Sequence, residues 1–441
     1  MIITRFSPSP TGYIHVGNVR TAIVNYLFTK KHNGKMILRM DDTDPKRSKA
    51  EYTDAIIADL KWLGLNWDEF YKQSDKLTYY TKVRDKLIKD GFIYPCFETE
   101  EELGLKRKTQ LQRGVPPIYD REALNLSKSE IEQKISNGEK PYFRFKLDDK
   151  KISWHDGVKG EISFKERAFS DPVVFRADNS PTYTFCSVID DIELNITDII
   201  RGEDHISNTA VQIQIFRSLT DKLPNFHHLS LLKTKETEIS KRDGGFDVRS
   251  LKNQGVDAAA ITSLLARIGT SDNVEALTDY KDLIAEFDIS KFSQSAIIYN
   301  EKDLVNLNRK ILAKRNFSEV KNILTDLNID ISENFWLSIR ENINDYSEIE
   351  VWQKIFQSNF NTEIIAADKE FLSLAANFLP EDLNVDEFKL WIKRLSKQTG
   401  RKGKELYHPI RTAITGQDSG PELSKIIPLL GYEEVKKRLN G

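Results

Sequence analysis

Short apolar runs and one amphipathic stretch organise the first 40 residues of the chain. Residues 2–6 form a β-branched run that predicts a strand, and residues 35–40 predict a second one. Between them, apolar side chains recur at helical spacing over residues 18–31, and Asn33-Gly34 predicts where that helix ends. Strand, loop, helix and strand in this order form a βαβ unit. The pattern therefore predicts a parallel sheet with a ligand site at the carboxyl ends of its strands.

The hydrophobic pattern changes twice further along the chain. A second helix is predicted over residues 50–63, and residues 93–172 are then rich in Glu, Lys and Pro, which we interpret as an insertion into the parallel domain. From about residue 250 onward, apolar positions recur at helical spacing to the end. Further strands are predicted at residues 142–147, 161–164, 173–175, 182–188 and 198–200.

The composition predicts a multidomain protein with well-packed cores. The chain has 441 residues, and its 23 Phe, 15 Tyr and 6 Trp exclude global disorder although 30% of the residues are charged. Two cysteines exclude a disulfide framework, and no apolar run is suited to a signal peptide or a membrane span. We therefore expect a cytoplasmic protein without a membrane partner. The net charge of −2 argues against a globally basic nucleic-acid binder but leaves local basic surfaces open.

Two segments carry candidate phosphate chemistry. A Pro-rich turn over residues 7–12 leads through His15 to Gly17 and Asn18 at the start of the predicted helix. A helix N-terminus suits a phosphate, and a glycine there lets a flat adenine approach the backbone. Residues 238–245 place Lys241 before two glycines, on a loop that can close over phosphates. Taken singly, each is better explained as a capped turn with a surface histidine, or as an exposed charged turn.

Together, in this order and some 220 residues apart, the two segments resemble the HIGH and KMSKS signatures of class I aminoacyl-tRNA synthetases. More narrowly, the chain resembles the glutamyl-tRNA synthetases over its whole length. The matching segments are residues 5–12, 42–44, 180–185, 190–191, 200–205, 239–242, 409–416 and 420–423.

The resemblance implies an α/β fold, with a Rossmann-type parallel-sheet catalytic domain, an α+β insertion, and all-α stem-contact and anticodon-binding domains. The implied parts are the first half of the catalytic domain at 1–92, an inserted acceptor-stem-binding domain at 93–172, the second catalytic half at 173–235, the KMSKS-type loop and helical stem-contact domain at 236–310, and an all-α anticodon-binding region at 311–441.

The implied reaction is the ATP-dependent ligation of L-glutamate to tRNA through glutamyl-adenylate, with release of pyrophosphate and AMP. Because the attacking carboxylate is already ionised, the enzyme needs positioning and cationic stabilisation rather than a nucleophile of its own. The implied catalytic residues are His15, Gly17, Asn18, Lys241 and Arg242. The implied ATP-binding residues are Pro8, Ser9, Pro10, Thr11, Gly12, His15, Gly17, Asp204, Ile239, Ser240 and Lys241.

For the amino acid, the resemblance implies that Arg5 binds the side-chain carboxylate of glutamate. A guanidinium offers only hydrogen-bond donors, so it rejects the amide of glutamine. The implied glutamate-binding residues are Arg5, Ser7, Ser9, Asp41, Tyr183, Ser187 and Arg201. Asp190-Asp191 is discounted as a metal pair; Mg²⁺ is expected to arrive with ATP. No zinc is expected, because Cys96 has no Cys or His partner at ligand spacing.

A basic stretch near the C-terminus is a candidate tRNA surface. Lys393, Lys397 and Arg401 lie at i, i+4 and i+8, which predicts one helix face; a merely solvated face is the alternative. The predicted tRNA-binding residues are Asn342, Lys393, Lys397, Arg401, Arg411, Gly420 and Pro421.

The sequence departs from the family pattern at three positions. Asp41 replaces a glutamate, and Glu238 replaces the first lysine of the KMSKS-type loop. Asn342 stands where discriminating members carry an arginine that reads the third anticodon base. This last change predicts relaxed tRNA choice, so that glutamine tRNA is also glutamylated.

Three other interpretations are weighed. A short relative that glutamylates a modified tRNA base lacks the helical region after about residue 310, and a glutaminyl-tRNA synthetase would be β-rich where residues 371–379 and 387–395 predict helices. A tRNA-binding paralogue without catalysis is disfavoured by the intact His15, Gly17 and Lys241. We expect a monomeric enzyme.

Overall fold

The computed structural model describes residues 1–233, 247–357, 360, 362 and 364–441. The chain divides into two compact units. The first unit comprises Met1–Ser250, Leu265–Val274 and Asp279–Tyr299; the second comprises Leu251–Leu264, Glu275–Thr278 and Asn300–Gly441.

The strands among the described residues are β1 (Ile3–Phe6), β2 (Lys35–Met40), β3 (Glu69–Lys72), β4 (Ile93–Cys96), β5 (Tyr142–Phe145), β6 (Ile152–Asp156), β7 (Gly160–Phe164), β8 (Val173–Phe175), β9 (Asp198–Gly202), β10 (Asn225–Leu229), β11 (Leu232–Lys233) and β12 (Ile297–Ile298). The helices up to residue 299 are α1 (Val16–Lys31), α2 (Ala50–Trp62), α3 (Leu77–Lys89), α4 (Glu100–Gln112), α5 (Lys128–Ser136), α6 (Tyr183–Glu193), α7 (Ile206–Leu219), α8 (Val248–Asn253), α9 (Ala258–Arg267) and α10 (Tyr280–Glu286). The helices after it are α11 (Glu301–Lys314), α12 (Phe317–Asp326), α13 (Glu333–Ile339), α14 (Glu348–Ile355), α15 (Lys369–Asn377), α16 (Val385–Thr399), α17 (Lys404–Thr415), α18 (Leu423–Leu430) and α19 (Tyr432–Asn440).

A parallel sheet forms the centre of the first unit. In the part of the chain that the structure describes, its strand order is β3-β2-β1-β9-β10-β6-β7, and only the β6–β7 pair is antiparallel. The chain leaves β1 toward β2 and β3 on one side, and later adds β9 and β10 on the other. The order therefore reverses between β1 and β9, and this reversal is where ligands bind in open parallel sheets.

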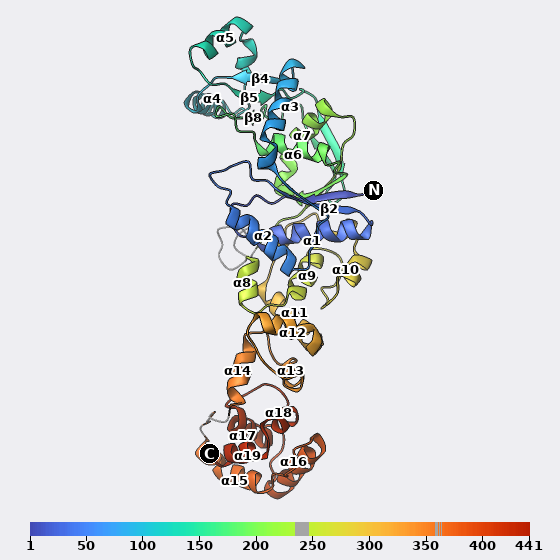
Figure 1. The fold of residues 1–441 in the computed structure, drawn as a ribbon, viewed down its shortest axis with the longest axis vertical. Helices are drawn as coiled ribbons and strands as arrows, with labels where there is room; N and C mark the ends of the chain where they lie inside the picture. Colours follow the sequence, from blue (N-terminus) through green and yellow to red (C-terminus); the bar gives the residue numbers. More distant parts are fainter. Residues whose placement is uncertain (234–246, 358–359, 361, 363) are drawn as a thin grey trace. The chain divides into compact units, whose positions relative to one another are not determined.

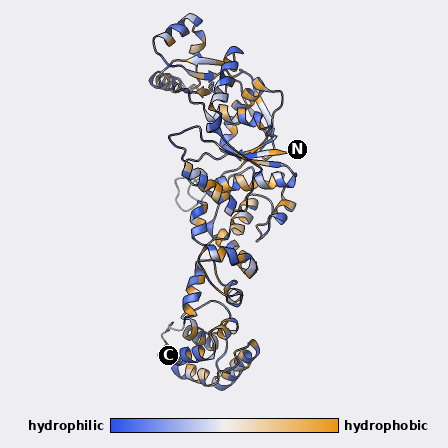
Figure 2. Cartoon of the chain, viewed as in Figure 1, coloured by the Kyte–Doolittle hydropathy of each residue, from blue (hydrophilic) through white to orange (hydrophobic). Residues whose placement is uncertain are grey.

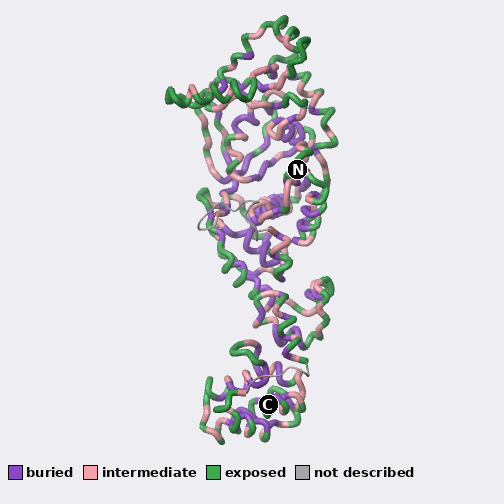
Figure 3. Tube along the Cα trace, turned by 90° about the vertical axis from the view of Figure 1, so that its left-hand side faces the viewer, coloured by how far each residue is buried: buried purple, intermediate pink, exposed green. Residues whose placement is uncertain are grey.

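Helices cover both faces of this sheet, with α1 and α2 on one side and α6 and α7 on the other (Figure 1). The apolar positions of α1 that the sequence predicts, including Val19, Ile23 and Leu27, are buried. Buried residues run through the interior of the unit, and exposed ones lie around them (Figure 3). The predicted βαβ unit is confirmed, with α1 beginning two residues earlier than expected, at Val16.

The segment 93–172 contains two structural parts. β4 and β5 pair with β8 in a small antiparallel sheet, next to which α4 and α5 lie (Figure 1). The β6–β7 hairpin instead extends the large parallel sheet, where β6 pairs with β10. The insertion-like segment thus supplies two strands to the sheet that carries the ligand site.

The strand predicted at residues 182–188 is wrong, because these residues begin helix α6. Seven consecutive residues of this helix, 185–191, are buried between the sheet and α7. A short run that is buried on all sides shows no clear period, so a helix and a buried strand look alike in the sequence.

The second unit is helical in the part of it that the structure describes, apart from its connections. One hydrophobic cluster joins α12, α13 and α14 around Trp336, and another joins α15 to α19 around Trp391. Hydrophobic and polar residues alternate along these helices (Figure 2), as expected for helices with one buried face. The helices predicted at 371–379 and 387–395 are confirmed.

Gly34 stands where β2 begins, with no room for a side chain. A Cβ added there would lie 2.4 Å from the carbonyl oxygen of Ile2, which accepts the hydrogen bond of Lys35 N. We predict that Gly34→Ala lowers the free energy of unfolding by about 1–3 kcal/mol, because backbone must move. Gly104→Ala, in the middle of α4 with open space around it, is the control and should stabilise by about 0.5–1 kcal/mol. Urea unfolding measures both; a Gly34→Ala protein as stable as the control would contradict the prediction.

Candidate active site

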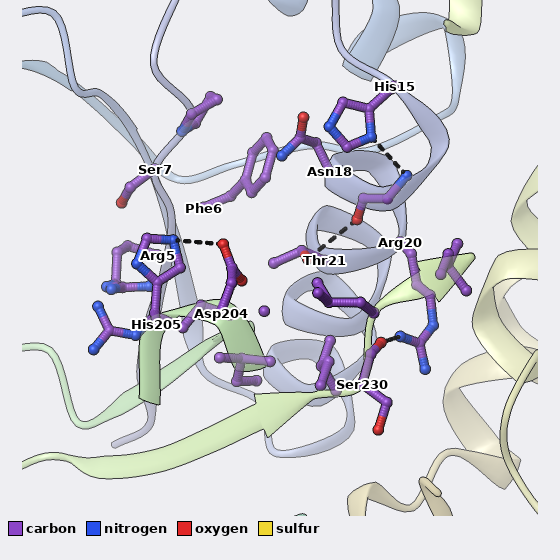
Figure 4. A pocket seen from close by; sticks show the side chains of 18 of the residues that line it. Arg5, Phe6, Ser7, His15, Asn18, Arg20, Thr21, Asp204, His205 and Ser230 are labelled. Carbon is purple, nitrogen blue, oxygen red and sulfur yellow. Dashed lines mark hydrogen bonds and ion pairs between the residues drawn. The ribbon is translucent and has the colours of Figure 1, made fainter. Parts of the chain in front are cut away.

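A cavity of about 340 Å³ opens where the strand order reverses. Arg5 and Phe6 line it from the carboxyl end of β1, and Arg201 and Gly202 line it from the carboxyl end of β9. The first turns of α1 form another wall, with His15 and α1 residues facing the strand ends across the cavity (Figure 4). Two cationic side chains from neighbouring strands and one helix N-terminus thus share one space.

His15 ends the loop after β1 and caps α1. Its Nδ1 accepts a hydrogen bond of 3.1 Å from the backbone N–H of Gly17, so in the neutral ring the proton lies on Nε2. A Cβ on Gly17 would lie 2.9 Å from Cε1 of the ring, closer than real contacts allow. The spacing of the two residues therefore has a structural cause: the glycine makes room for the imidazole at the helix end.

A buried carboxylate fixes the position of Arg5. Its Nε lies 3.2 Å from Oδ1 of Asp191 in α6, and both side chains are 3% exposed. The same oxygen accepts a hydrogen bond of 2.8 Å from Nη1 of Arg39, which comes from β2. Because Nε points to Asp191, the two terminal nitrogens of Arg5 remain for the cavity that this residue lines.

Arg39 is the centre of a wider buried network. It donates two hydrogen bonds to Asp41, of 2.7 and 3.3 Å, and lies 3.6 Å from Asp190. Asp190 also accepts hydrogen bonds from Gln73 and Tyr80. Burial raises the pKa of Asp41 to about 6, although the charge of Arg39 opposes this shift. Asp41 is thus occupied by Arg39, and it does not line the cavity as the sequence-based assignment expected.

Arg201 is buried without an ion-pair partner among the described residues. Its Nη1 donates to the hydroxyl of Tyr183 at 3.0 Å, and its Nη2 donates to Thr209 Oγ1 and Gln212 Oε1, both at 2.6 Å. Burial lowers the pKa of Arg201, and nearby His205 has its pKa lowered to about 4 by burial and by the charge of Arg201. A guanidinium surrounded by neutral acceptors is suited to an anionic ligand.

Four buried polar atoms of the lining residues have no hydrogen-bond partner within the described ranges, one of them Nε of Arg20. The other three are Ser7 Oγ, Asn18 Oδ1 and Arg201 Nε. Buried polar groups are normally paired, since leaving one unpaired costs about 1–3 kcal/mol. Their presence around one cavity favours a polar ligand there.

The structure brings together nine of the fifteen predicted active-site residues that lie within its described ranges. Those that line the cavity are Arg5, Ser7, Pro8, His15, Gly17, Asn18, Tyr183, Arg201 and Asp204. Those that do not are Ser9, Pro10, Thr11, Gly12, Asp41 and Ser187. Those that lie outside the described residues are Glu238, Ile239, Ser240, Lys241 and Arg242.

The residues that miss the cavity have other contacts. The Pro-rich turn binds the segment after β2, where Asp41 N and Lys49 N donate to the carbonyls of Pro8 and Pro10. Ser187 is buried behind Tyr183 and donates to its carbonyl at 2.7 Å. Arg39, Thr209 and Gln212 support the site, and sequence reasoning did not find them. The signal for this network in the sequence is the Asp190-Asp191 pair, whose carboxylates bind Arg5 and Arg39.

In the second unit, Arg411 and Gly420 adjoin each other. A Cβ on Gly420 would lie 2.5 Å from the ring of Trp352 and 3.6 Å from Nη1 of Arg411. This Nη1 is buried without a partner among the described residues, and burial lowers the pKa of Arg411. Pro421 follows and is buried, whereas Asn342 is half-buried in the turn after α13.

The predicted single face of Lys393, Lys397 and Arg401 is wrong. α16 ends at Thr399, and Gly400 follows with φ +73°, so Arg401 lies beyond the helix, where it pairs with Asp368 at 2.8 Å. Lys393 and Lys397 do share a side of α16, where both line a cavity of about 370 Å³.

Neither a metal cluster nor a membrane span is found in the described part of the chain. No group of three or more His, Cys, Asp or Glu side chains there could hold a metal ion. No helix in those residues is both long and apolar enough to cross a bilayer.

Comparison with known proteins decides the family. A family model described as the catalytic domain of class I tRNA synthetases (E and Q) matches residues 1–306, and one described as an anticodon-binding domain matches residues 337–441. The chain belongs to the class I tRNA synthetases of the glutamate and glutamine type. It is 48% identical to glutamate–tRNA ligase 1 of Rickettsia bellii and to glutamate–tRNA ligase 2 of Rickettsia canadensis, with 99% of each chain covered.

Solved structures agree with this family. The crystal structure of a glutamate–tRNA ligase from Elizabethkingia meningosepticum with its amino acid is similar, with a TM-score of 0.85 and 25% identity, over 100% of this chain and 98% of that one. The enzyme from Elizabethkingia anophelis has a TM-score of 0.84 and 27% identity, over 100% and 99%. The expected Rossmann-type α/β fold, and the expected ATP-using ligase that joins glutamate to tRNA for translation, are confirmed.

The buried network should be sensitive to loss of a single charge. Asp191→Asn removes the carboxylate that pairs with Arg5, which is also one of the carboxylates that pair with Arg39. We therefore predict a loss of about 3 kcal/mol in the free energy of unfolding. Asp85→Asn removes an exposed pair with Arg84 and should change it by at most about 0.5 kcal/mol. Chemical unfolding of both variants measures the difference. Equal losses would show that the network contributes little.

Proposed function

We propose that the cavity binds L-glutamate and ATP side by side and joins them into glutamyl-adenylate. The α-carboxylate of glutamate attacks the α-phosphorus of ATP, and pyrophosphate leaves. The glutamyl group then passes to a ribose hydroxyl at the end of tRNA, and AMP leaves. The enzyme's contribution is to hold two anions close together and to stabilise the charge on phosphate, which requires positioned cations and N–H groups.

For glutamate, we place the side-chain carboxylate between Arg5 and Arg201. Both guanidiniums are buried, both line the cavity, and they come from neighbouring strands. Tyr183, already bonded to Arg201, flanks the carboxylate. Donors alone surround it on the arginine side, so the NH₂ group of glutamine would find no acceptor there.

For ATP, we place the phosphates at the N-terminus of α1. The unpaired N–H groups and the positive end of the helix dipole favour phosphate there, and His15 can donate from Nε2. Mg²⁺ is proposed to arrive with the nucleotide and to retain its waters. Lys241 and Arg242 are proposed to neutralise the leaving pyrophosphate.

The proposed roles of the segments follow the family. Residues 93–172 bind the acceptor stem, residues 236–310 contain the KMSKS-type loop and contact the tRNA stem, and residues 311–441 bind the anticodon. Support for the last role comes from the anticodon-binding model that matches residues 337–441. The protein is proposed to act as a monomer in the cytoplasm, where translation takes place.

The observation that carries the proposal is the pair of buried arginines in one cavity. We predict that Arg5→Gln raises the KM for glutamate about a hundredfold in tRNA aminoacylation, because a charge-assisted contact is lost, and changes the KM for ATP less than about twofold. The control is Arg217→Gln, an exposed residue outside the cavity. Equal effects on the two KM values would contradict the assignment of Arg5 to glutamate.

We further propose that the enzyme glutamylates glutamine tRNA as well as glutamate tRNA, because Asn342 lacks the charge of an anticodon-reading arginine. Labelled glutamate should be accepted by both purified tRNAs, and Asn342→Arg should shift the preference toward glutamate tRNA. The absence of detectable charging of glutamine tRNA by the wild-type enzyme would refute this.

A further inference from the structure

Behind Arg201, a chain of buried side chains leads away from the cavity. Thr209 Oγ1, which accepts from Arg201, lies 2.8 Å from Nε2 of His228 in β10. His228 Nδ1 lies 2.5 Å from Oδ2 of Asp156 in β6. Thr209, His228 and Asp156 are all at most 1% exposed. The chain thus links the β6–β7 hairpin to the guanidinium in the cavity.

The carboxylate of Asp156, at the end of this series of side chains, determines where each proton lies. An ionised carboxylate only accepts, so His228 must donate from Nδ1 to Asp156, and its Nε2 must be the acceptor in the neutral ring. The hydroxyl of Thr209 then donates to Nε2, which is closer than its alternative acceptor, the His205 carbonyl at 3.1 Å. The lone pairs of Thr209 are therefore left for the Nη2 of Arg201.

The charge states agree with this order. Burial would raise the pKa of Asp156, but hydrogen bonds from the His228 ring and from the backbone N–H groups of residues 159 and 228 oppose burial and lower the pKa to about 2. Burial lowers the pKa of His228, and the charge of Arg201 lowers it further. The chain at neutral pH therefore holds one carboxylate and one neutral imidazole, and Arg201 receives an oriented but uncharged acceptor.

We propose that Asp156, His228 and Thr209 form a positioning relay that fixes Arg201 for glutamate while leaving its charge to the substrate. A carboxylate in direct contact would also fix the guanidinium, but it would compete with the substrate for it. The relay instead orients the lone pairs of Thr209 Oγ1 toward Arg201. The negative charge of the relay stays on Asp156 in β6. This inference rests on the proposed role of Arg201 in glutamate binding.

The neighbouring residue of the same strand provides an internal comparison. His227 points to the other face of the sheet and pairs with Asp198 at 3.2 Å. It is also buried, and it contacts Phe28 of α1 rather than any residue of the relay. Two buried His–Asp pairs thus lie side by side, and one of them leads to the cavity.

A single isosteric substitution can reverse the direction of the hydrogen bonds along the relay. Oδ1 of Asp156 accepts three backbone N–H groups, from residues 158, 159 and 228, so in Asp156→Asn the amide oxygen must occupy that position. The NH₂ group then faces Nδ1 of His228 and forces the proton onto Nε2. His228 would donate to Thr209 and compete with Arg201 for its lone pairs. Asp198→Asn is the matched control.

The experiment measures the KM for glutamate, the KM for ATP and kcat in tRNA aminoacylation. Asp156→Asn should raise the KM for glutamate about tenfold, with the KM for ATP and kcat within about twofold, whereas Asp198→Asn should leave all three near wild type. A loss shared by both variants, or an equal rise in both KM values, would show a merely structural role and overturn the relay.

Thr209 gives an independent test. Thr209→Val should also raise the KM for glutamate about tenfold, and Thr209→Ser should restore it, because the hydroxyl returns. The control is Thr29→Val, another buried helical threonine whose hydroxyl bonds the carbonyl four residues earlier but no arginine. If Thr209→Val does not fold, the two Asp→Asn variants decide. Activity of the wild-type enzyme that does not saturate with glutamate would refute the proposed function; a normal wild type with unaffected variants would refute the relay alone.

Discussion

The site depends on keeping guanidinium groups charged and buried at the ends of parallel strands. Removing an arginine from water is costly, and proteins offset that cost by carboxylates or hydrogen-bond acceptors. Two of the arginines that line the cavity, Arg5 and Arg201, use different solutions. Arg5 shares Asp191 with Arg39, while Arg201 has neutral acceptors and no ion pair among the described residues. The first solution gives rigidity, and the second leaves positive charge for a substrate.

The fold explains how these groups meet. Parallel strands place all their carboxyl ends at one edge of the sheet, and the reversal of strand order between β1 and β9 leaves a gap between the flanking connections. Asp190 and Asp191 come from α6, whereas Asp41 follows β2, so the network connects α6 to the carboxyl ends of β1 and β2. The β6–β7 hairpin adds Asp156 from the segment that otherwise contains the small sheet.

Much of this could be predicted from the sequence. The βαβ unit, the helical second unit and the cavity residues of the first motif follow from periodicity and from spaced motifs, because local pattern and global fold agree there. The close packing of His15 on Gly17 gives a physical reason for a spacing that the sequence shows only as a motif.

Other features depend on contacts between distant segments. Arg39, Thr209 and His228 lie in ordinary-looking strands and helices, and only tertiary structure brings them to the cavity. Helix α6 resembles a strand because it is buried on all sides. The spacing of Lys393, Lys397 and Arg401 fits one helical face, but Gly400 ends the helix before Arg401.

We propose that the side-chain carboxylate of glutamate lies between Arg5 and Arg201. A crystal structure of the enzyme with L-glutamate bound tests it most directly. We expect carboxylate oxygens about 2.7–3.2 Å from guanidinium nitrogens of both residues. A glutamate whose side-chain carboxylate contacts neither arginine would contradict it.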